Sequence, residues 1–337
     1  MPQTLAAPTI SRNEGSDFTP LAKQVRESGL MERRTGYYAR VITFNVLATA
    51  AIWVGVGLLG NWWALLLAVP AALMSTMSGF LGHDSGHKQI AASAKTNRRL
   101  GLLLGDLMIG MSHGWWNNKH SQHHANPNHA EKDPDVGAGA LVFTKEQAAA
   151  REGRLGWLTR NQAKLFFPML LLEGLALQVA SVQDLKNRPV KERWIEGSLM
   201  AAHAVIYLAL LFTLLPVPVA LTFFAVHQGV FGLHLGMAFA PNHKGMPMPG
   251  PDDKWDHLRK QVLTSRNIRG GPVTDWFLGG LNYQIEHHLF PGLPRPSLRK
   301  VQPMVRAHCE KVGLPYAETG LIDSYAQALR HIDDVGN

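Results

Sequence analysis

Four long stretches of this 337-residue chain carry almost no charge, and they constrain the fold more than any other feature. They cover residues 41–60, 62–80, 195–215 and 217–240. A helix rises about 1.5 Å per residue, so some 20 apolar residues cross a hydrocarbon core of about 30 Å. The first two stretches are separated only by Gly60 and Asn61, and the last two only by Pro216, so the four form two pairs. The sequence predicts an all-α integral membrane protein with four transmembrane helices in two hairpins.

The positions of the basic residues predict the orientation of these hairpins. Arg33, Arg34 and Arg40 precede the first stretch, Lys88 and Lys95 follow the second, and neither hairpin tip carries a charge. Cytoplasmic loops collect Lys and Arg, whereas short translocated loops do not. We therefore expect a protein of the cell inner membrane whose termini, long loops and histidine clusters are cytoplasmic.

The net charge of +8 raises the question of a nucleic-acid partner. The basic residues flank apolar spans and form no clustered recognition element, so we expect the anionic surface of a bilayer and no nucleic acid. The single cysteine, Cys309, excludes an internal disulfide and thiolate clusters. The predicted organisation is a mobile polar cytoplasmic leader (1–40), a membrane domain (41–300) and a C-terminal helical cap (301–337).

Three histidine clusters stand outside the apolar stretches. They read "HDSGH" (83–87), "HSQHH" (120–124) and "QIEHH" (284–288). Side chains at i, i+3 and i+4 share one face of a helix, so each cluster can present its rings to one point. The clusters contain His83, His87, His120, His123, His124, Gln284, His287 and His288.

These clusters predict a metal site. A lone histidine usually has an ordinary hydrogen-bonding role, which we assign to His113, His129, His203, His227, His257, His308 and His331. Neutral imidazoles in clusters suit zinc, copper or iron, whereas hard ions prefer oxygen ligands. Seven histidines and Gln284 exceed one tetrahedral site, so the pattern favours two metal ions.

A shared site also limits the number of spans, because all three clusters must lie on one side of the membrane. Exactly two spans can then separate the second cluster from the third. A further apolar segment, residues 166–182, carries Glu173. We expect it to lie along the membrane interface or to pack on the helical bundle, with Glu173 facing water or a partner.

In their order and placement, "HDSGH", "HSQHH" and "QIEHHLFP" resemble the boxes of the membrane fatty acid desaturase family, over residues 40–300 or so. Gln284 at the head of the third box is similar to the front-end, linoleoyl-CoA desaturase-like bacterial type. The resemblance implies two iron ions, and O2-dependent formation of a cis double bond in a lipid-linked or CoA-linked acyl chain. It also implies a further histidine ligand after the fourth span, for which we prefer His243, beside Asn242, to His234.

Some relatives of this kind carry a fused cytochrome b5 domain with a His-Pro-Gly-Gly motif, which is absent here. The resemblance therefore implies a separate electron donor, such as a ferredoxin or a flavin reductase system.

Several other side chains are candidates for supporting roles. Carboxylates often accept the free N–H of ligand imidazoles, and those near the boxes are Asp84, Asp106, Asp275 and Glu286. Trp115, Trp116 and Trp276 are candidates to line an acyl tunnel, or else to anchor the chain at the interface. Arg266, Asn267 and Arg269 are candidates to meet a phosphate head group.

Three other functions compete with desaturation. A hydroxylase for alkyl or lipid chains could use the same scaffold, and the sequence separates the two poorly. A zinc-dependent membrane hydrolase also places histidines at helix ends, but such proteins usually have seven spans and fewer ligands. Simple metal storage would not require the fixed i, i+3, i+4 spacing.

Overall fold

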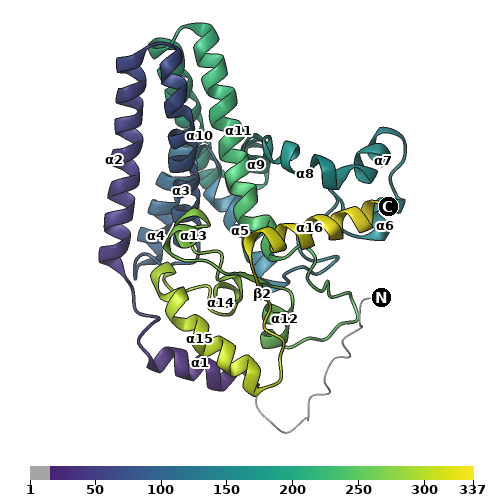
Figure 1. Cartoon of the computed structure of the whole chain (residues 1–337). Helices are drawn as coiled ribbons and strands as arrows, with labels where there is room; N and C mark the ends of the chain where they lie inside the picture. The colour runs from purple at the N-terminus through teal and green to yellow at the C-terminus, as the bar shows by residue number, and fades with distance from the viewer. Residues whose placement is uncertain (1–15) are drawn as a thin grey trace.

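The computed structural model describes residues 16–337, and its long helices form the two expected hairpins (Figure 1). Helix α2 (Thr35–Leu59) turns at Gly60, which has a positive φ of 57° that suits glycine. The 3-10 turn η1 (Trp62–Leu67) leads into α3 (Ala68–Gly86). The second hairpin joins α10 (Val190–Leu214) to α11 (Val217–Phe239). The predicted all-α architecture with four long apolar helices is confirmed.

These helices extend beyond the apolar stretches at their polar ends. Helix α3 continues six residues past position 80, and η4 (Ala240–Asn242) prolongs α11. Backbone hydrogen bonds do not require apolar side chains, so a helix can leave the hydrocarbon layer without breaking. This extension carries the first histidine cluster out of the membrane on the same rigid element that spans it.

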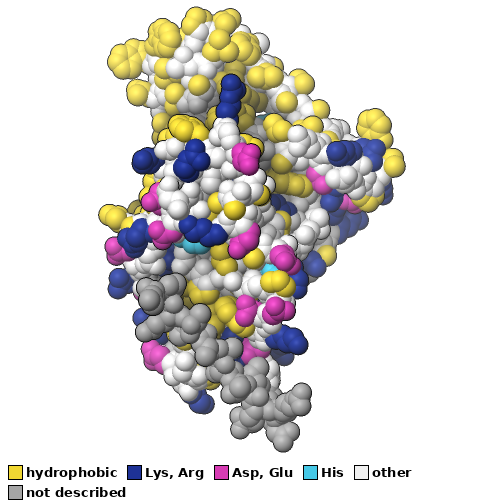
Figure 2. Space-filling model, turned by 90° about the vertical axis from the view of Figure 1, so that its right-hand side faces the viewer, with side chains coloured by type: hydrophobic (Ala, Val, Ile, Leu, Met, Phe, Trp, Pro, Cys, Tyr) yellow, Lys and Arg dark blue, Asp and Glu magenta, His cyan; other side chains and the backbone are white. Residues whose placement is uncertain are grey.

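Hydrophobic side chains cover the end of the molecule that the hairpins form, and charged side chains gather below them (Figure 2). Phe44, Leu47 and Leu58 on α2 are exposed, as expected of residues that face lipid. Inside the first hairpin, Asn45 donates to the backbone oxygen of Met74 at 2.9 Å and accepts from Ser78 at 2.8 Å. These bonds tie α2 to α3 where water is absent.

Short helices form a layer below the hairpins, and they carry most of the histidine clusters (Figure 1). Those between the hairpins nearest the site are α4 (Ala94–Gly101), the π-helical η2 (Leu102–Leu107) and α5 (His113–Ala125). Those after α11 are α12 (His257–Leu263), α13 (Pro272–Phe277), α14 (Gln284–Leu289), α15 (Arg295–Lys311) and α16 (Leu321–Gly336). A two-residue parallel ladder, which was not predicted, joins β1 (Asn267–Ile268) to β2 (Glu318–Thr319).

The prediction of a mobile leader needs correction for its described part. Residues 1–15 lie outside the described residues, but α1 (Phe18–Glu27) is a helix that packs against α15. Leu21 and Val25, one turn apart, are fully buried in the same cluster as Val301 and Val305. The amphipathic spacing of this helix outweighs the polar average of the segment. The predicted boundary at residue 300 likewise falls inside α15.

The segment predicted to lie along the interface is broken into two helices. Helix α8 (Gln162–Leu170) and α9 (Glu173–Asp184, continued by η3, Leu185–Asn187) meet at 75°, and together they are apolar enough to count as one broken span. Helices α6 (Lys145–Ala149) and α7 (Gly153–Arg160) precede them. Gly174 and Gly232 let α9 approach α11 closely, since a Cβ on Gly232 would lie 2.7 Å from the backbone nitrogen of Gly174.

That α8 and α9 return to the side from which they came stays a prediction, which labelling can test. In a Cys309→Ser background, Arg154→Cys before α8 and Lys186→Cys after α9 should react with an impermeant maleimide from the same side of the membrane. Asn61→Cys at a hairpin tip should react from the opposite side. Reaction of Arg154→Cys and Lys186→Cys from opposite sides would show that the pair crosses.

Candidate metal centre

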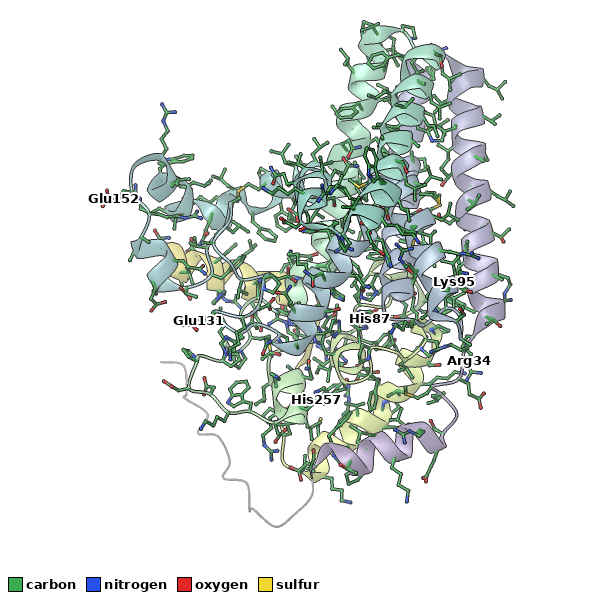
Figure 3. All side chains as sticks on the ribbon, turned by 180° about the vertical axis from the view of Figure 1, so that it is seen from behind. Arg34, His87, Lys95, Glu131, Glu152 and His257 are labelled. Atoms are coloured by element: carbon green, nitrogen blue, oxygen red, sulfur yellow. The ribbon has the colours of Figure 1, made fainter. Side chains whose placement is uncertain are left out.

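Five histidines from three helices form the first group. His83 lies on α3 and His87 directly follows it, His120 and His124 lie on α5, and His287 lies on α14. One ring nitrogen of each lies within 4.8 Å of all the others. The Nε2 atoms of His83 and His287 are 3.1 Å apart, and that of His120 lies 2.9 Å from His87 and 3.0 Å from His124. Figure 3 shows His87 between the long helices and the layer of short ones.

Three histidines from different segments form the second group. They are His123 on α5, His243 just after η4, and His288 on α14, again within 4.8 Å of one another. The Nε2 atom of Gln284 lies 2.9 Å from Nε2 of His243. His234, the alternative considered from the sequence, instead lies 2.7 Å from the backbone oxygen of Phe277. All eight predicted histidines therefore belong to the two groups, with Gln284 beside the second.

Residues behind the rings fix their orientation. Nδ1 of His123 lies 2.9 Å from Asp133, Nδ1 of His243 lies 2.9 Å from the backbone oxygen of Thr264, and Nδ1 of His288 lies 2.9 Å from Gln261. Each contact occupies Nδ1 and leaves Nε2 for the centre of the group, as is usual for histidines that bind metals. Asp84 plays the corresponding part for Nδ1 of His83, at 3.2 Å.

The interior of the cluster keeps most of these rings neutral. Burial, followed by the proximity of other imidazoles, lowers the pKa well below its usual value for five of them, which are His87, His120, His124, His287 and His288. Burial lowers the pKa of His243 to about 3. For His123 burial acts in the same direction, but Asp133 and Asp135 outweigh it and raise the pKa. Neutral imidazole is the form that coordinates a metal.

The residues fit two iron ions. Ligand nitrogens at about 2.1 Å from a common ion lie roughly 3 Å apart when they are neighbours, close to the separations in the first group. Nδ1 of His124 and Nε2 of His288 are buried and have no hydrogen-bond partner in the described part of the chain. Two groups of imidazoles, one of five and one of three with Gln284 beside it, supply donors for two ions of the type that prefers nitrogen.

A cavity of about 340 Å³ opens beside both groups. His83, His120, His123, His243 and Gln284 form one part of its wall, and Trp115 and Trp116 line it as well. The ring of Trp116 stacks on His120 with centroids 4.4 Å apart. The apolar part of the wall consists of Gly79, Ile109, Leu141, Phe143, Phe166, Leu170, Leu177, Leu235 and Phe239 among others. Glu173 lies in the same wall, facing this cavity.

Several predicted supporting residues lie elsewhere. Arg266 and Asn267 are buried, so the prediction that they meet a head group is wrong. Arg266 binds Ser324 and Gln327, whereas Asn267 donates to Glu286 at 2.7 Å. A basic residue in a loop looks available from the sequence, but the C-terminal helix α16 covers this one.

The remaining candidates also have defined partners. Trp276 lines a second cavity and not this one. Asp106 accepts from the backbone N–H of His113, and Asp275 accepts from Asn282. Glu286 accepts from Asn267 and Tyr316, and burial raises its pKa to about 7. Asn242 donates to Oε1 of Gln284 at 3.2 Å, which places it in support of the second group.

The sequence reasoning missed Asp133, Gln261 and Arg295. Asp133 follows the second box in "DPD" (133–135), a local signal that could have been used. Gln261 stands in a helix without other signals. Arg295 lies with Nη2 2.7 Å from Oδ2 of Asp84, and only the fold brings these two residues together.

If Asp133 orients His123 toward a metal, Asp133→Asn should lower the affinity of the purified protein for Fe(II) by about 10-fold to 100-fold. Competition with a chromophoric chelator would measure this. Glu131→Gln, a change at an exposed acidic residue two positions away, is the matched control. Equal affinities of the two variants would contradict the role of Asp133.

Comparison with known proteins agrees with this geometry. The fatty acid desaturase family model matches residues 60–320. An acyl-lipid (9-3)-desaturase of Physcomitrium patens is 31% identical over 281 residues, covering 80% of this chain and 53% of that protein. Fatty acid desaturase 3 of Bos taurus is 29% identical over 95% of this chain and 73% of its own length. Delta(6)-fatty-acid desaturase fat-3 of Caenorhabditis elegans is 28% identical, over 94% and 74% respectively.

The chain thus spans about half the length of the first of these relatives and about three quarters of the other two. The matched region includes all three histidine clusters and His243. The chain belongs to the fatty acid desaturase family, whose members introduce double bonds into acyl chains as O2-dependent oxidoreductases.

Proposed function

We propose that this chain desaturates an acyl chain held in the 340 Å³ cavity, using two iron ions bound by the two histidine groups. The observation that carries the proposal is the convergence of eight histidines in two groups, six of them buried and four of them in the wall of an otherwise largely apolar cavity. His83, His87, His120, His124 and His287 would hold one ion. His123, His243 and His288, with Gln284 beside them, would hold the other.

The stoichiometry of desaturation defines what else the protein needs. Two adjacent methylenes lose two hydrogens, O2 is reduced to two waters, and two further electrons and two protons must enter from outside. Iron would supply the activation of O2. We propose that a separate electron donor, such as a ferredoxin or a flavin reductase system, supplies these two electrons.

The protein's own part is to bind the acyl chain and keep water from the reacting carbons. Trp116 and Phe239 lie beside His83, with ring centroids at 5.3 Å and 6.4 Å, and cover the first group on the side of the cavity. An apolar wall stabilises methylenes by removing them from water. The reacting carbons would therefore lie between Trp116 and Phe239, next to the histidines.

Charged residues of the cavity indicate where the polar end of the substrate would lie. Lys119, Asp135, Glu173 and Lys244 line one region of it, and Lys119 pairs with Asp135 at 2.6 Å. Lys119 and Lys244 would contact the phosphate of a CoA or phospholipid head group. They replace Arg266 in the head-group role that the sequence first suggested. We propose a double bond toward the carboxyl end of the chain, as the name of the Delta(6) relative says of that protein.

We also propose that the histidine clusters and both termini face the cytoplasm of the cell inner membrane. The uncharged hairpin tips and the basic residues that flank the spans support this orientation. In that arrangement, α9 and its bend lie at the cytoplasmic interface.

The double variant His287→Ala, His288→Ala removes one ligand from each proposed ion. A host that expresses the intact chain with an electron donor should accumulate a new unsaturated fatty acid, and the double variant should lose it by roughly 100-fold or more, together with bound iron. Gas chromatography with mass spectrometry gives both the amount and the position of the double bond.

His308→Ala is the matched control, because His308 lies outside both groups and contacts the backbone oxygen of Asp17. This variant should retain iron and product. Hydroxylated chains in place of unsaturated ones would contradict desaturation, as would a product that persists in the double variant.

A further inference from the structure

A second cavity, of about 350 Å³, lies between the first hairpin and the layer of short helices. None of its lining residues belongs to the wall of the first cavity. Its apolar part is formed by α2, α3 and α13, through Val41, Phe44, Met74, Met77, Leu81 and Trp276. This is the size of a small-molecule site, and its walls suit part of an acyl chain.

The opposite part of this cavity is basic. Arg295 and Arg299 of α15 line it, and Arg299 is exposed. The one carboxylate in the lining, Asp275, is already engaged by Asn282 at 2.9 Å and by Tyr283 at 3.3 Å. Asp84 pairs with Arg295 at 2.7 Å, whereas Arg299 forms no ion pair in the described residues and is the cation open to a ligand.

Arg295 also has hydrogen-bonding capacity to spare. Its Nε atom is buried and has no hydrogen-bond partner in the described residues. Its Nη2 atom forms an ion pair with Oδ2 of Asp84 at 2.7 Å. A buried guanidinium donor without an acceptor is costly, so this end of the cavity favours an anion with oxygen acceptors.

The position of the cavity suits a lipid. It lies at the polar end of α2, where Phe44 is 62% exposed to the lipid side. On α13, beside the ends of α2 and α3 in Figure 1, Val273 is 80% and Trp276 46% exposed. Exposed apolar residues next to exposed arginine mark the level at which head groups meet acyl chains.

We propose that this second cavity binds an anionic lipid, with one acyl chain against Val41, Phe44 and Met77 and its phosphate or carboxylate at Arg299 and Arg295. The apolar wall continues the lipid-facing surface of α2, so the chain enters from the bilayer. The guanidinium groups select against a neutral head group, because a zwitterionic lipid brings its own cation to the same place. Within the described residues, the site shares no lining residue with the proposed desaturation site, and Arg295 is linked to that site only through Asp84.

Native mass spectrometry of the full chain in a neutral detergent tests this proposal. Wild-type protein is titrated with phosphatidylglycerol, phosphatidylcholine or oleate of matched chain length. Phosphatidylglycerol or oleate should bind at least about tenfold more tightly than phosphatidylcholine. Stronger binding of phosphatidylglycerol would assign a phosphate head group, and stronger binding of oleate a carboxylate. Equal binding of all three would overturn the proposal.

Two variants and their matched controls place the binding. Arg299→Gln removes charge from the cavity and Val41→Trp fills its apolar part, and each should weaken binding about tenfold. Arg40→Gln and Leu47→Trp make the same kinds of change on the exposed surface of α2, outside the cavity, and should bind as wild type. Circular dichroism checks that all four fold. If both cavity variants bind as wild type, or the controls weaken binding equally, the lipid is merely annular and the proposal fails.

Discussion

The arrangement of this protein depends on gathering eight imidazole rings in its interior while keeping most of them neutral. Ring centroids lie as close as 4.2 Å, between His124 and His288, and positive charges at that spacing would repel strongly. Burial resolves the conflict by favouring the neutral form. Neutral rings, however, bring lone pairs together, and these need an acceptor of electron pairs. The same interior that makes the cluster possible therefore makes it suited to bind metal.

The membrane hairpins provide the rigid framework for this gathering. Helix α3 runs without interruption from the bilayer into the first cluster, and α11 with η4 delivers His243. Helix α5 presents three rings, of which His120 and His124 belong to the first group and His123 to the second. Helix α14 likewise contributes His287 to the first group and His288 to the second. Two short helices thereby connect the two groups.

What could be predicted from the sequence was local in character. Apolar length gives the four long helices, and i, i+4 spacing gives the ligand-bearing faces, because both depend on neighbours along one helix.

The supporting residues could not be predicted in this way. The carboxylate that supports His123 lies ten residues away, and the amide that supports His288 lies 27 away. Arg295 reaches Asp84 from the other end of the chain. Arg266 was misassigned for the same reason, since its burial under α16 depends on a segment almost sixty residues later. Helix α1 was missed because its two buried residues are diluted by polar neighbours.

The large separation between ligands along the chain has a consequence for biosynthesis. Nitrogens that nearly touch belong to His83 and His287, which are 204 positions apart. Both hairpins are translated before the third box, so neither group is complete until synthesis is nearly finished. A chain stalled before α14 would hold six of the eight histidines, and neither group would have its full set of rings.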